Sequence, residues 1–215
     1  GNMVSTTRTW ETIASTDIGM DFGVLQNRLY GSFDYFWKTN KNMLIPITYP
    51  TVLGTDAPAT NNGRLEIKGW EVVLGWRDKI GDFEYSVRAS LSDAKNEIVE
   101  KGGKDNPVLG LNYKDNGYLN GYPLDSYLGY MFDGNIAVGD AMYKDLDGDG
   151  VLSVSGDGTP GAGDAVYLGD RNPRYSFGFN FNASYKGFDL AFFLQGVAKR
   201  TTFLESAARM PFQEW

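Results

Sequence analysis

Three carboxylates occupy alternate positions in one short acidic stretch, Asp145-Leu146-Asp147-Gly148-Asp149-Gly150. Aspartates at the first, third and fifth positions with glycine at the sixth are typical of a calcium loop. The carboxylates converge on one hard cation, and the glycine permits the sharp turn. The backbone carbonyl of Val151 would supply the seventh-position ligand. The stretch therefore predicts a structural Ca²⁺ site, with Ca²⁺ favoured over Mg²⁺ because the ligands are flexible and all oxygen.

The end of the loop departs from the calcium pattern, since Gly156 stands where a bidentate glutamate is expected. Asp157 or Asp164 would substitute if the Gly-rich insertion stretches the loop, because the cost of loop closure rises slowly with length. A solvated acidic turn without metal is the alternative, since Asp and Gly are ordinary turn formers. Loss of order on chelation would separate the two.

Composition excludes several kinds of chemistry. The chain has no cysteine and no histidine, which rules out disulfides, His-based zinc sites and a Ser-His-Asp triad. The net charge is −7, and the segment 93–170 alone carries 14 acidic and 5 basic residues, so no nucleic-acid partner is expected. We expect no enzymatic activity. Charged residues at alternate strand positions are interpreted as the polar lining of a lumen: Asp34, Lys38, Glu71, Arg77, Glu84 and Arg88.

Three pairs of strands are indicated by alternation of apolar and polar residues. They cover residues 10–24 with 28–38, 64–78 with 83–92, and 175–185 with 188–195. Leu65 and Ile67 fall out of phase with Trp70, which predicts a bulge near Gly69. The fold class is all-β, with antiparallel up-and-down strands arranged as three hairpins.

The connections between these strands alternate in length. Short turns follow the first strand of each pair, whereas residues 39–63 and 93–170 form long connections, and the second holds 15 of the 27 glycines. Short turns at one end and long loops at the other are typical of a transmembrane β-barrel. A soluble β-sandwich is the alternative for the alternation alone. Because six strands cannot close such a barrel, we expect the chain to be part of a larger one.

Several blocks carry a family resemblance. They are 121–134 (GYPLDSYLGYMFDG), 139–150 (GDAMYKDLDGDG), 168–179 (LGDRNPRYSFGF) and the hairpin blocks 186–190 (KGFDL) and 192–196 (FFLQG). In this order and spacing the chain resembles SusC/RagA-type TonB-dependent transporters, over about residues 10–196. Asp170-Arg171 departs from the family pattern, so the corner there is expected to differ in shape. The resemblance implies that residues 1–215 are a late part of the barrel domain, with 93–170 as a long acidic extracellular region.

The same resemblance implies an integral protein of the bacterial outer membrane, in contact with its lipid. It would import glycans or peptides, work with a SusD-like surface lipoprotein, and couple to the TonB complex through an N-terminal region that this chain lacks. The alternative is a soluble or surface-displayed calcium-dependent β-domain for carbohydrate binding or adhesion. A dockerin-type module fits less well, since only one Asp-rich loop is present. Tyrosines of the long connections are candidate stacking surfaces for an oligosaccharide or peptide cargo: Tyr49, Tyr113, Tyr118, Tyr122 and Tyr127.

Overall fold

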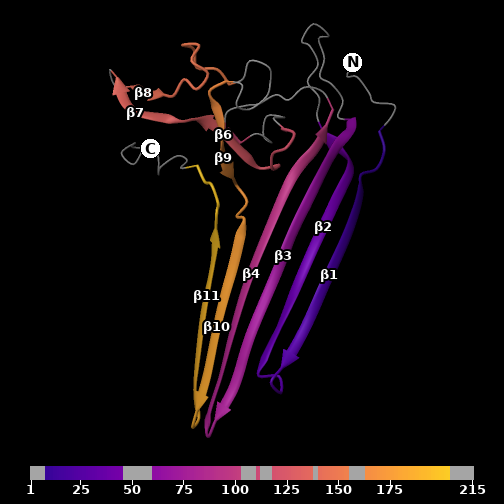
Figure 1. The fold of residues 1–215 in the computed structure, drawn as a ribbon, viewed down its shortest axis with the longest axis vertical. Helices are drawn as coiled ribbons and strands as arrows, with labels where there is room; N and C mark the ends of the chain where they lie inside the picture. The colour runs from indigo at the N-terminus through magenta and orange to yellow at the C-terminus, as the bar shows by residue number, and fades with distance from the viewer. Residues whose placement is uncertain are drawn as a thin grey trace, which may run out of the picture.

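The computed structural model describes residues 8–45, 60–102, 110–111, 118–137, 140–154 and 163–203. These residues form a six-stranded, a three-stranded and a two-stranded sheet. The two small sheets lie together at one end of the large one (Figure 1). No helix of the described residues is long and apolar enough to cross a membrane.

The large sheet is antiparallel, with the order β1-β2-β3-β4-β10-β11. Every neighbouring pair except β4–β10 is also consecutive along the chain, so the predicted three hairpins and all-β fold are confirmed. β1 and β11 form the edges of the sheet. Its strands are β1 Thr12–Val24, β2 Leu29–Ile45, β3 Thr60–Ile80, β4 Phe83–Lys101, β10 Tyr175–Tyr185 and β11 Phe188–Ala198.

The hairpins reverse in short turns at one end of the sheet, here called the turn end; the opposite end is the loop end (Figure 1). Between β10 and β11 the turn is Lys186-Gly187, with φ of 48° and 86°. Two successive positive φ values are those of a type I′ turn, whose twist matches the flanking strands. Residues 25–27 connect β1 to β2 with φ between 55° and 61°. The chain therefore reverses tightly, as the sequence predicted.

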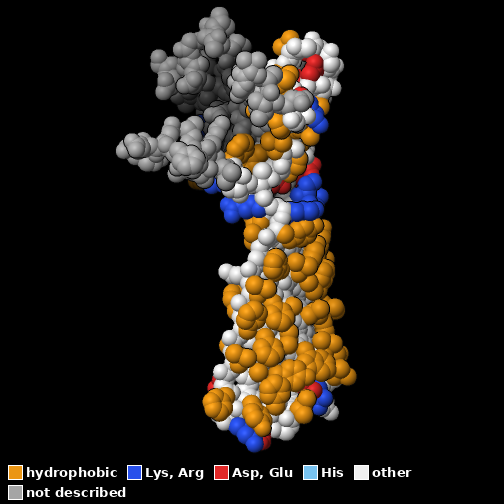
Figure 2. Space-filling model, turned by 90° about the vertical axis from the view of Figure 1, so that its left-hand side faces the viewer, with side chains coloured by type: hydrophobic (Ala, Val, Ile, Leu, Met, Phe, Trp, Pro, Cys, Tyr) orange, Lys and Arg blue, Asp and Glu red, His pale blue; other side chains and the backbone are white. Residues whose placement is uncertain are grey.

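One face of the sheet is apolar along its length. The register places Phe33, Val72, Leu91 and Phe177 in one row across four strands. Because side chains alternate along a strand, residues two positions away share this face, here called the apolar face. Figure 2 shows it as a continuous hydrophobic surface. Its side chains stay exposed, as for Leu190 at 61%, and a soluble protein rarely leaves so large a patch uncovered.

The opposite, polar face carries the predicted lumen residues. The register places Asp34, Glu71, Ser92 and Ser176 in one row across four neighbouring strands. The alternation of one apolar and one polar face is what a barrel between lipid and a water-filled interior requires.

Charged residues bound the apolar face at both ends. On β3 its members run from Trp70 to Trp76, with Lys68 beyond one end and Asp78 beyond the other. The ten residues from Lys68 to Asp78 extend ~33 Å along a strand, or ~25 Å along the membrane normal at a tilt of ~40°. That height matches the apolar band of a transmembrane barrel.

Aromatic rings cover glycines of the neighbouring strand at four places in the sheet. In each pair the ring belongs to the direct cross-strand partner, and a Cβ added to the glycine would lie 2.2–2.9 Å from the nearest ring atom. The absence of a side chain at these positions lets the ring lie flat on the backbone, which fixes register. The pairs are Phe22 on Gly31, Tyr30 on Gly75, Phe36 on Gly69, and Phe177 on Gly196.

At the loop end the strands extend further than predicted. β2 continues to Ile45, β3 begins at Thr60 and β4 continues to Lys101. The connections predicted as 39–63 and 93–170 are therefore shorter, because their first and last residues lengthen the sheet. Residues 46–59 lie outside the described part of the chain.

The predicted bulge near Gly69 is wrong. Gly69 pairs regularly with Phe36 and Ala94, and the irregularity between β3 and β4 lies between Arg64 and Leu65. The change of phase has another cause. The polar-face positions become apolar near the loop end, where a small core forms.

This core lies under the loop-end segments. Leu65 and Ile98 are direct partners, and both are buried. Ile98 also donates its N–H to the carbonyl of Tyr122 at 2.9 Å and accepts from Gly121 at 2.7 Å. The chain near residue 121 thus continues the sheet beside β4 beyond the end of β10. Among the residues that the structure describes, the buried hydrophobic ones are Ile45, Leu65, Ile98, Leu119, Tyr127, Leu128 and Ala165.

The two small sheets are built from the long acidic region. The three-stranded sheet has the order β5 (Gly110–Leu111), β6 (Ser126–Tyr130) and β9 (Ala165–Asp170). β7 (Phe132–Ala137) pairs with β8 (Asp140–Tyr143) in the other. The acidic stretch follows β8, so these sheets position the candidate calcium loop at the loop end.

Candidate functional site

The acidic stretch folds as a tight loop held by its own carboxylates. Asp145 accepts hydrogen bonds from the backbone N–H groups of Gly148 at 2.6 Å and Gly150 at 2.8 Å. Asp149 accepts one from Val151 at 2.7 Å. Gly148 and Gly150 have φ of 79° and 80°, which a residue with a Cβ rarely adopts. The Asp-x-Asp-Gly-Asp-Gly pattern therefore forms a compact turn with hydrogen bonds of its own.

The same loop brings together the three predicted cation ligands. One carboxylate oxygen from each of Asp145, Asp147 and Asp149 lies within 4.8 Å of the others, and all three residues are exposed. The backbone N–H of Asp149 lowers the pKa of Asp147, but desolvation and the neighbouring carboxylates together raise this pKa above its ordinary value. The cluster therefore carries mutual repulsion that a bound cation would relieve. All-oxygen ligands at this spacing suit Ca²⁺.

Asp164, from outside the acidic stretch, is hydrogen-bonded to the backbone of this loop. It is fully buried, and its carboxylate accepts the backbone N–H of Leu146 at 2.6 Å and of Ser153 at 2.8 Å. Its own N–H donates to the carbonyl of Ser153 at 3.0 Å. The hydrogen bonds from Ser153 and Leu146 lower the pKa of Asp164. Asp164 thus closes the two ends of the loop. Its predicted role as a metal ligand, and that of the Val151 carbonyl, stay predictions, and Asp157 lies outside the described residues.

The candidate stacking tyrosines fall into different environments. Tyr127 is buried with its ring 4.9 Å from that of Phe203, so it packs within the loop-end core. The ring of Tyr122 lies 5.8 Å from that of Tyr167, a residue outside the predicted set. Tyr118 is half-buried, and burial followed by the charge of Asp125 raises its pKa. Tyr49 and Tyr113 lie outside the described residues.

A polar cluster at the junction of the large sheet and the small sheets was missed at the sequence level. The guanidinium of Arg174 binds both carboxylate oxygens of Asp93, with Nη2 2.9 Å from Oδ2. Asp93 is buried, and the two residues stand 81 positions apart in the chain. A bidentate pair of this kind fixes orientation as well as distance. It therefore ties the start of β10 to β4 where both leave the apolar face.

The corner at Asp170 completes this junction. Thr201 donates its N–H to the carbonyl of Asp170 at 2.7 Å and its hydroxyl to the carbonyl of Leu168 at 3.2 Å. Arg171 donates its N–H to the carbonyl of Asp125 at 3.0 Å. Burial raises the pKa of Asp170 and of its hydrogen-bond partner Tyr167. Only the block 168–179 offered a sequence signal for this corner.

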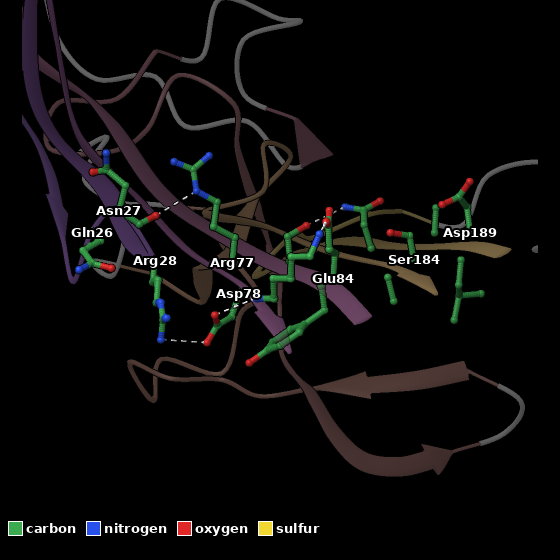
Figure 3. A pocket seen from close by; sticks show the side chains of 15 residues that line it. Gln26, Asn27, Arg28, Arg77, Asp78, Glu84, Ser184 and Asp189 are labelled. Carbon is green, nitrogen blue, oxygen red and sulfur yellow. Dashed lines mark hydrogen bonds and ion pairs between the residues drawn. The ribbon is translucent and has the colours of Figure 1, made fainter. Parts of the chain in front are cut away.

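The polar face carries a hollow of about 700 Å³ near the turn end. Figure 3 shows Arg28, Arg77, Asp78 and Glu84 around it. Arg28 Nη1 lies 3.3 Å from Asp78 Oδ2, and Arg77 donates to the carbonyl of Asn27 at 2.9 Å. Glu84 forms an ion pair with Lys79 of the same hairpin. Two of the expected lumen charges, Arg77 and Glu84, therefore interact with residues at the hairpin turns, and no ion pair among the described residues joins two of the six.

These features define a class of protein. Six long antiparallel strands with one apolar face, one polar face, short turns at one end and long segments at the other form part of the wall of a transmembrane β-barrel. The sequence agrees: residues 5–198 match the family model described as TonB dependent receptor-like, beta-barrel. The chain belongs to this family. The alternative of a soluble calcium-dependent β-domain is thereby set aside.

Known relatives agree with this assignment. TonB-dependent receptor P26 of Formosa agariphila is 30% identical over 211 residues, which cover 88% of this chain and 20% of that protein. TonB-dependent receptor SusC of Bacteroides thetaiotaomicron is 27% identical over 200 residues, which cover 86% and 19%. The RagAB peptide importer in its open-open state has the same fold, with a TM-score of 0.70 at 21% identity over 90% of this chain and 21% of that one. The chain thus spans about a fifth of the length of these relatives.

Proposed function

We propose that this chain is a wall segment of an active importer of glycans or peptides, integral to the bacterial outer membrane. The main support is that the large sheet has an apolar face ~25 Å high and a polar face on its other side. Its strands lie within the residues that match the receptor family. Relatives similar over this region include SusC and the RagAB peptide importer. The segment supplies lipid contact on one face and part of the transport lumen on the other.

The proposed partners follow from the same family. A SusD-like surface lipoprotein would cover the loop end, where the small sheets and the half-buried Tyr118 and Tyr122 lie. Energy would come from the TonB complex through the receptor's N-terminal region. The cargo would be an oligosaccharide or peptide held among the loop-end segments. Tyr122 and Tyr167 are the best-placed aromatic surface for it among the described residues, since their rings lie close together and remain partly exposed.

The test of this function compares two lysine substitutions in the whole receptor, at adjacent positions on opposite faces. Leu74→Lys puts a charge on the apolar face, which costs ~2–4 kcal/mol at the middle of the membrane. Val73→Lys puts the same charge on the polar face. We expect Leu74→Lys to reduce the receptor in outer-membrane fractions and Val73→Lys to leave it there.

Uptake completes the test. Cells that carry the receptor with Val73→Lys should still accumulate labelled oligosaccharide or peptide, and cells without the receptor should not. Equal loss of both lysine variants from the outer membrane would contradict the assignment of faces. Unchanged uptake of every cargo tested in cells that lack the receptor would contradict the importer.

A second proposal concerns the acidic loop, which we infer holds a structural Ca²⁺. The convergence of Asp145, Asp147 and Asp149 supports it. Calorimetric melting of the whole receptor with and without EDTA tests it, with Asp147→Asn as the variant. Asp82→Asn, in a turn at the opposite end of the sheet, is the matched control. We expect EDTA to lower the melting temperature of the wild type and of Asp82→Asn, but not of Asp147→Asn. Identical melting of the wild type with and without EDTA would contradict the site.

A further inference from the structure

Cations gather on the apolar face where it ends toward the loops. Lys68 of β3 and Lys95 of β4 are direct cross-strand partners, and Lys68 is also opposite Trp37 of β2. Like charges directly opposite each other on a sheet are unfavourable unless an anion lies between them. Figure 2 shows Lys and Arg side chains at the upper edge of the hydrophobic surface.

Two more cations continue this row onto the next strands. The Arg174 guanidinium lies 5.8 Å from the centre of the Tyr175 ring, and the Lys199 ammonium lies 5.4 Å from the same ring. Arg174 also donates its N–H to the carbonyl of Lys199 at 3.2 Å. Tyr175 pairs with Asp93, which pairs with Trp70, so its ring shares their face. Arg174 directly precedes β10 and Lys199 directly follows β11, so both continue the pair of Lys68 and Lys95 across the loop-side end of the apolar face. The four cations Lys68, Lys95, Arg174 and Lys199 are here called the basic row.

Carboxylates accompany the basic row but are less exposed than its cations. Glu66 lies 3.1 Å from Lys68, with side-chain exposures of 26% and 60%. Glu97 lies 2.9 Å from Lys95, with exposures of 37% and 46%. Asp93 is 11% exposed against 36% for its partner Arg174. In each of these three ion pairs the cation is therefore more exposed than the carboxylate.

Along β3 and β4 the cations lie nearer the apolar face, and the carboxylates lie nearer the loop end. Glu66 and Glu97 are themselves direct partners, one step further from the apolar face than Lys68 and Lys95. Trp37 and the two lysines lie at one level, between the apolar face and these carboxylates. Aromatic side chains mark the level of the lipid headgroups, so the basic row stands where lipid phosphates stand.

We propose that the basic row binds the phosphate groups of anionic membrane lipids. The site rests on the membrane placement proposed above and adds a lipid class to it. Each ammonium or guanidinium of the row donates hydrogen bonds to phosphate oxygens. A phosphate that bridges Lys68 and Lys95 adds a second anionic partner to ammonium groups that Glu66 and Glu97 already hold in position. Lys199 is exposed and takes part in none of the ion pairs of the described residues, so its ammonium has no carboxylate partner to compete with a lipid phosphate.

Quenching of tryptophan fluorescence by brominated lipids tests the site in the whole receptor, purified in detergent. Trp37 and Trp70 lie beside the row, so bound brominated lipid quenches them. The probes are brominated phosphatidic acid and brominated phosphatidylcholine. The test variant is Lys68→Gln/Lys95→Gln/Lys199→Gln. The matched control is Lys79→Gln/Lys186→Gln at the turn end.

We expect the wild type and the control to prefer brominated phosphatidic acid by about fivefold or more, as attraction to even one surface cation would give. The triple variant should quench equally with both lipids. A triple variant that keeps the preference, or a control that loses it equally, overturns the site. A wild type quenched equally by both lipids overturns it while leaving the membrane placement intact. Quenching by neither lipid would reject the membrane placement and the site with it.

Discussion

Replacing Gly69 with alanine is expected to destabilise the barrel by overfilling a contact between strands. The added Cβ would lie 2.5 Å from Phe36 Cζ and 2.6 Å from the backbone oxygen of Asp93. Ordinary van der Waals contact begins near 3.4 Å, so both the ring and the strand must move. Overfilling of this kind costs ~1–3 kcal/mol, and the gain of alanine over glycine in a strand, ~0.5–1 kcal/mol, offsets only part of it. The net loss is ~1–2 kcal/mol.

Gly178→Ala is the matched control in the same sheet. Its added Cβ would meet only the Ser90 hydroxyl, at 2.9 Å, and a hydroxyl can rotate away. This variant should therefore be neutral or stabilised by ~0.5 kcal/mol. Urea unfolding of the whole receptor in detergent, followed by tryptophan fluorescence, should separate the two by ~2 kcal/mol, roughly a thirtyfold difference in the unfolding equilibrium. Equal midpoints for the two variants would refute the role of the ring-on-glycine contacts.

Three further changes test other parts of the fold. Arg174→Ala should lower the free energy of unfolding by about 2 kcal/mol, because it leaves the buried Asp93 carboxylate unpaired; an unchanged urea midpoint would contradict this. The lowered pKa of Asp164 stabilises the folded loop above the ordinary aspartate value of 3.8, and this contribution is lost as pH falls through the lowered value. The hydrogen-exchange protection of residues 145–153, measured against the intrinsic exchange rate at each pH, should therefore fall in acid for the wild type and lose that dependence in Asp164→Asn. Gly187→Val should cost ~1–2 kcal/mol because φ is 86° there, and an unaltered melting temperature would argue against the type I′ turn.

The sequence predicted the six long strands because period-two alternation is a local property. Val72, Leu74 and Trp76 reveal their common face whatever lies across from them, and the Lys186-Gly187 turn carries its own conformational preference. The error near Gly69 arose where a distant segment decides the face. Leu65 is apolar on the otherwise polar face, where it pairs with the buried Ile98, whose backbone is hydrogen-bonded to residues 121 and 122. Alternation along β3 carries no information about that distant segment.

In the candidate site, too, local contacts could be predicted from the sequence and contacts between distant residues could not. Asp145, Asp147 and Asp149 converge as predicted because only five residues and their own backbone are involved. Asp164 stays a predicted ligand, but the hydrogen bonds that it accepts from Leu146 and Ser153, which brace the loop, had no signal in the sequence. The pair of Asp93 and Arg174 spans 81 positions, and neither residue stands in a motif that would link them.

The strands extend beyond the basic row, and this extension separates the small sheets from the part of the barrel that contacts lipid. From Thr60 to Lys68, β3 continues for eight residues past the lipid level, which raises the loop-end segments by roughly 20 Å. Insertion into the membrane depends on the apolar residues between Lys68 and the turn end, whereas the described small sheets lie beyond this extension, at the loop end (Figure 1). We therefore expect substitutions in the small sheets to leave insertion of the strands into the membrane unchanged.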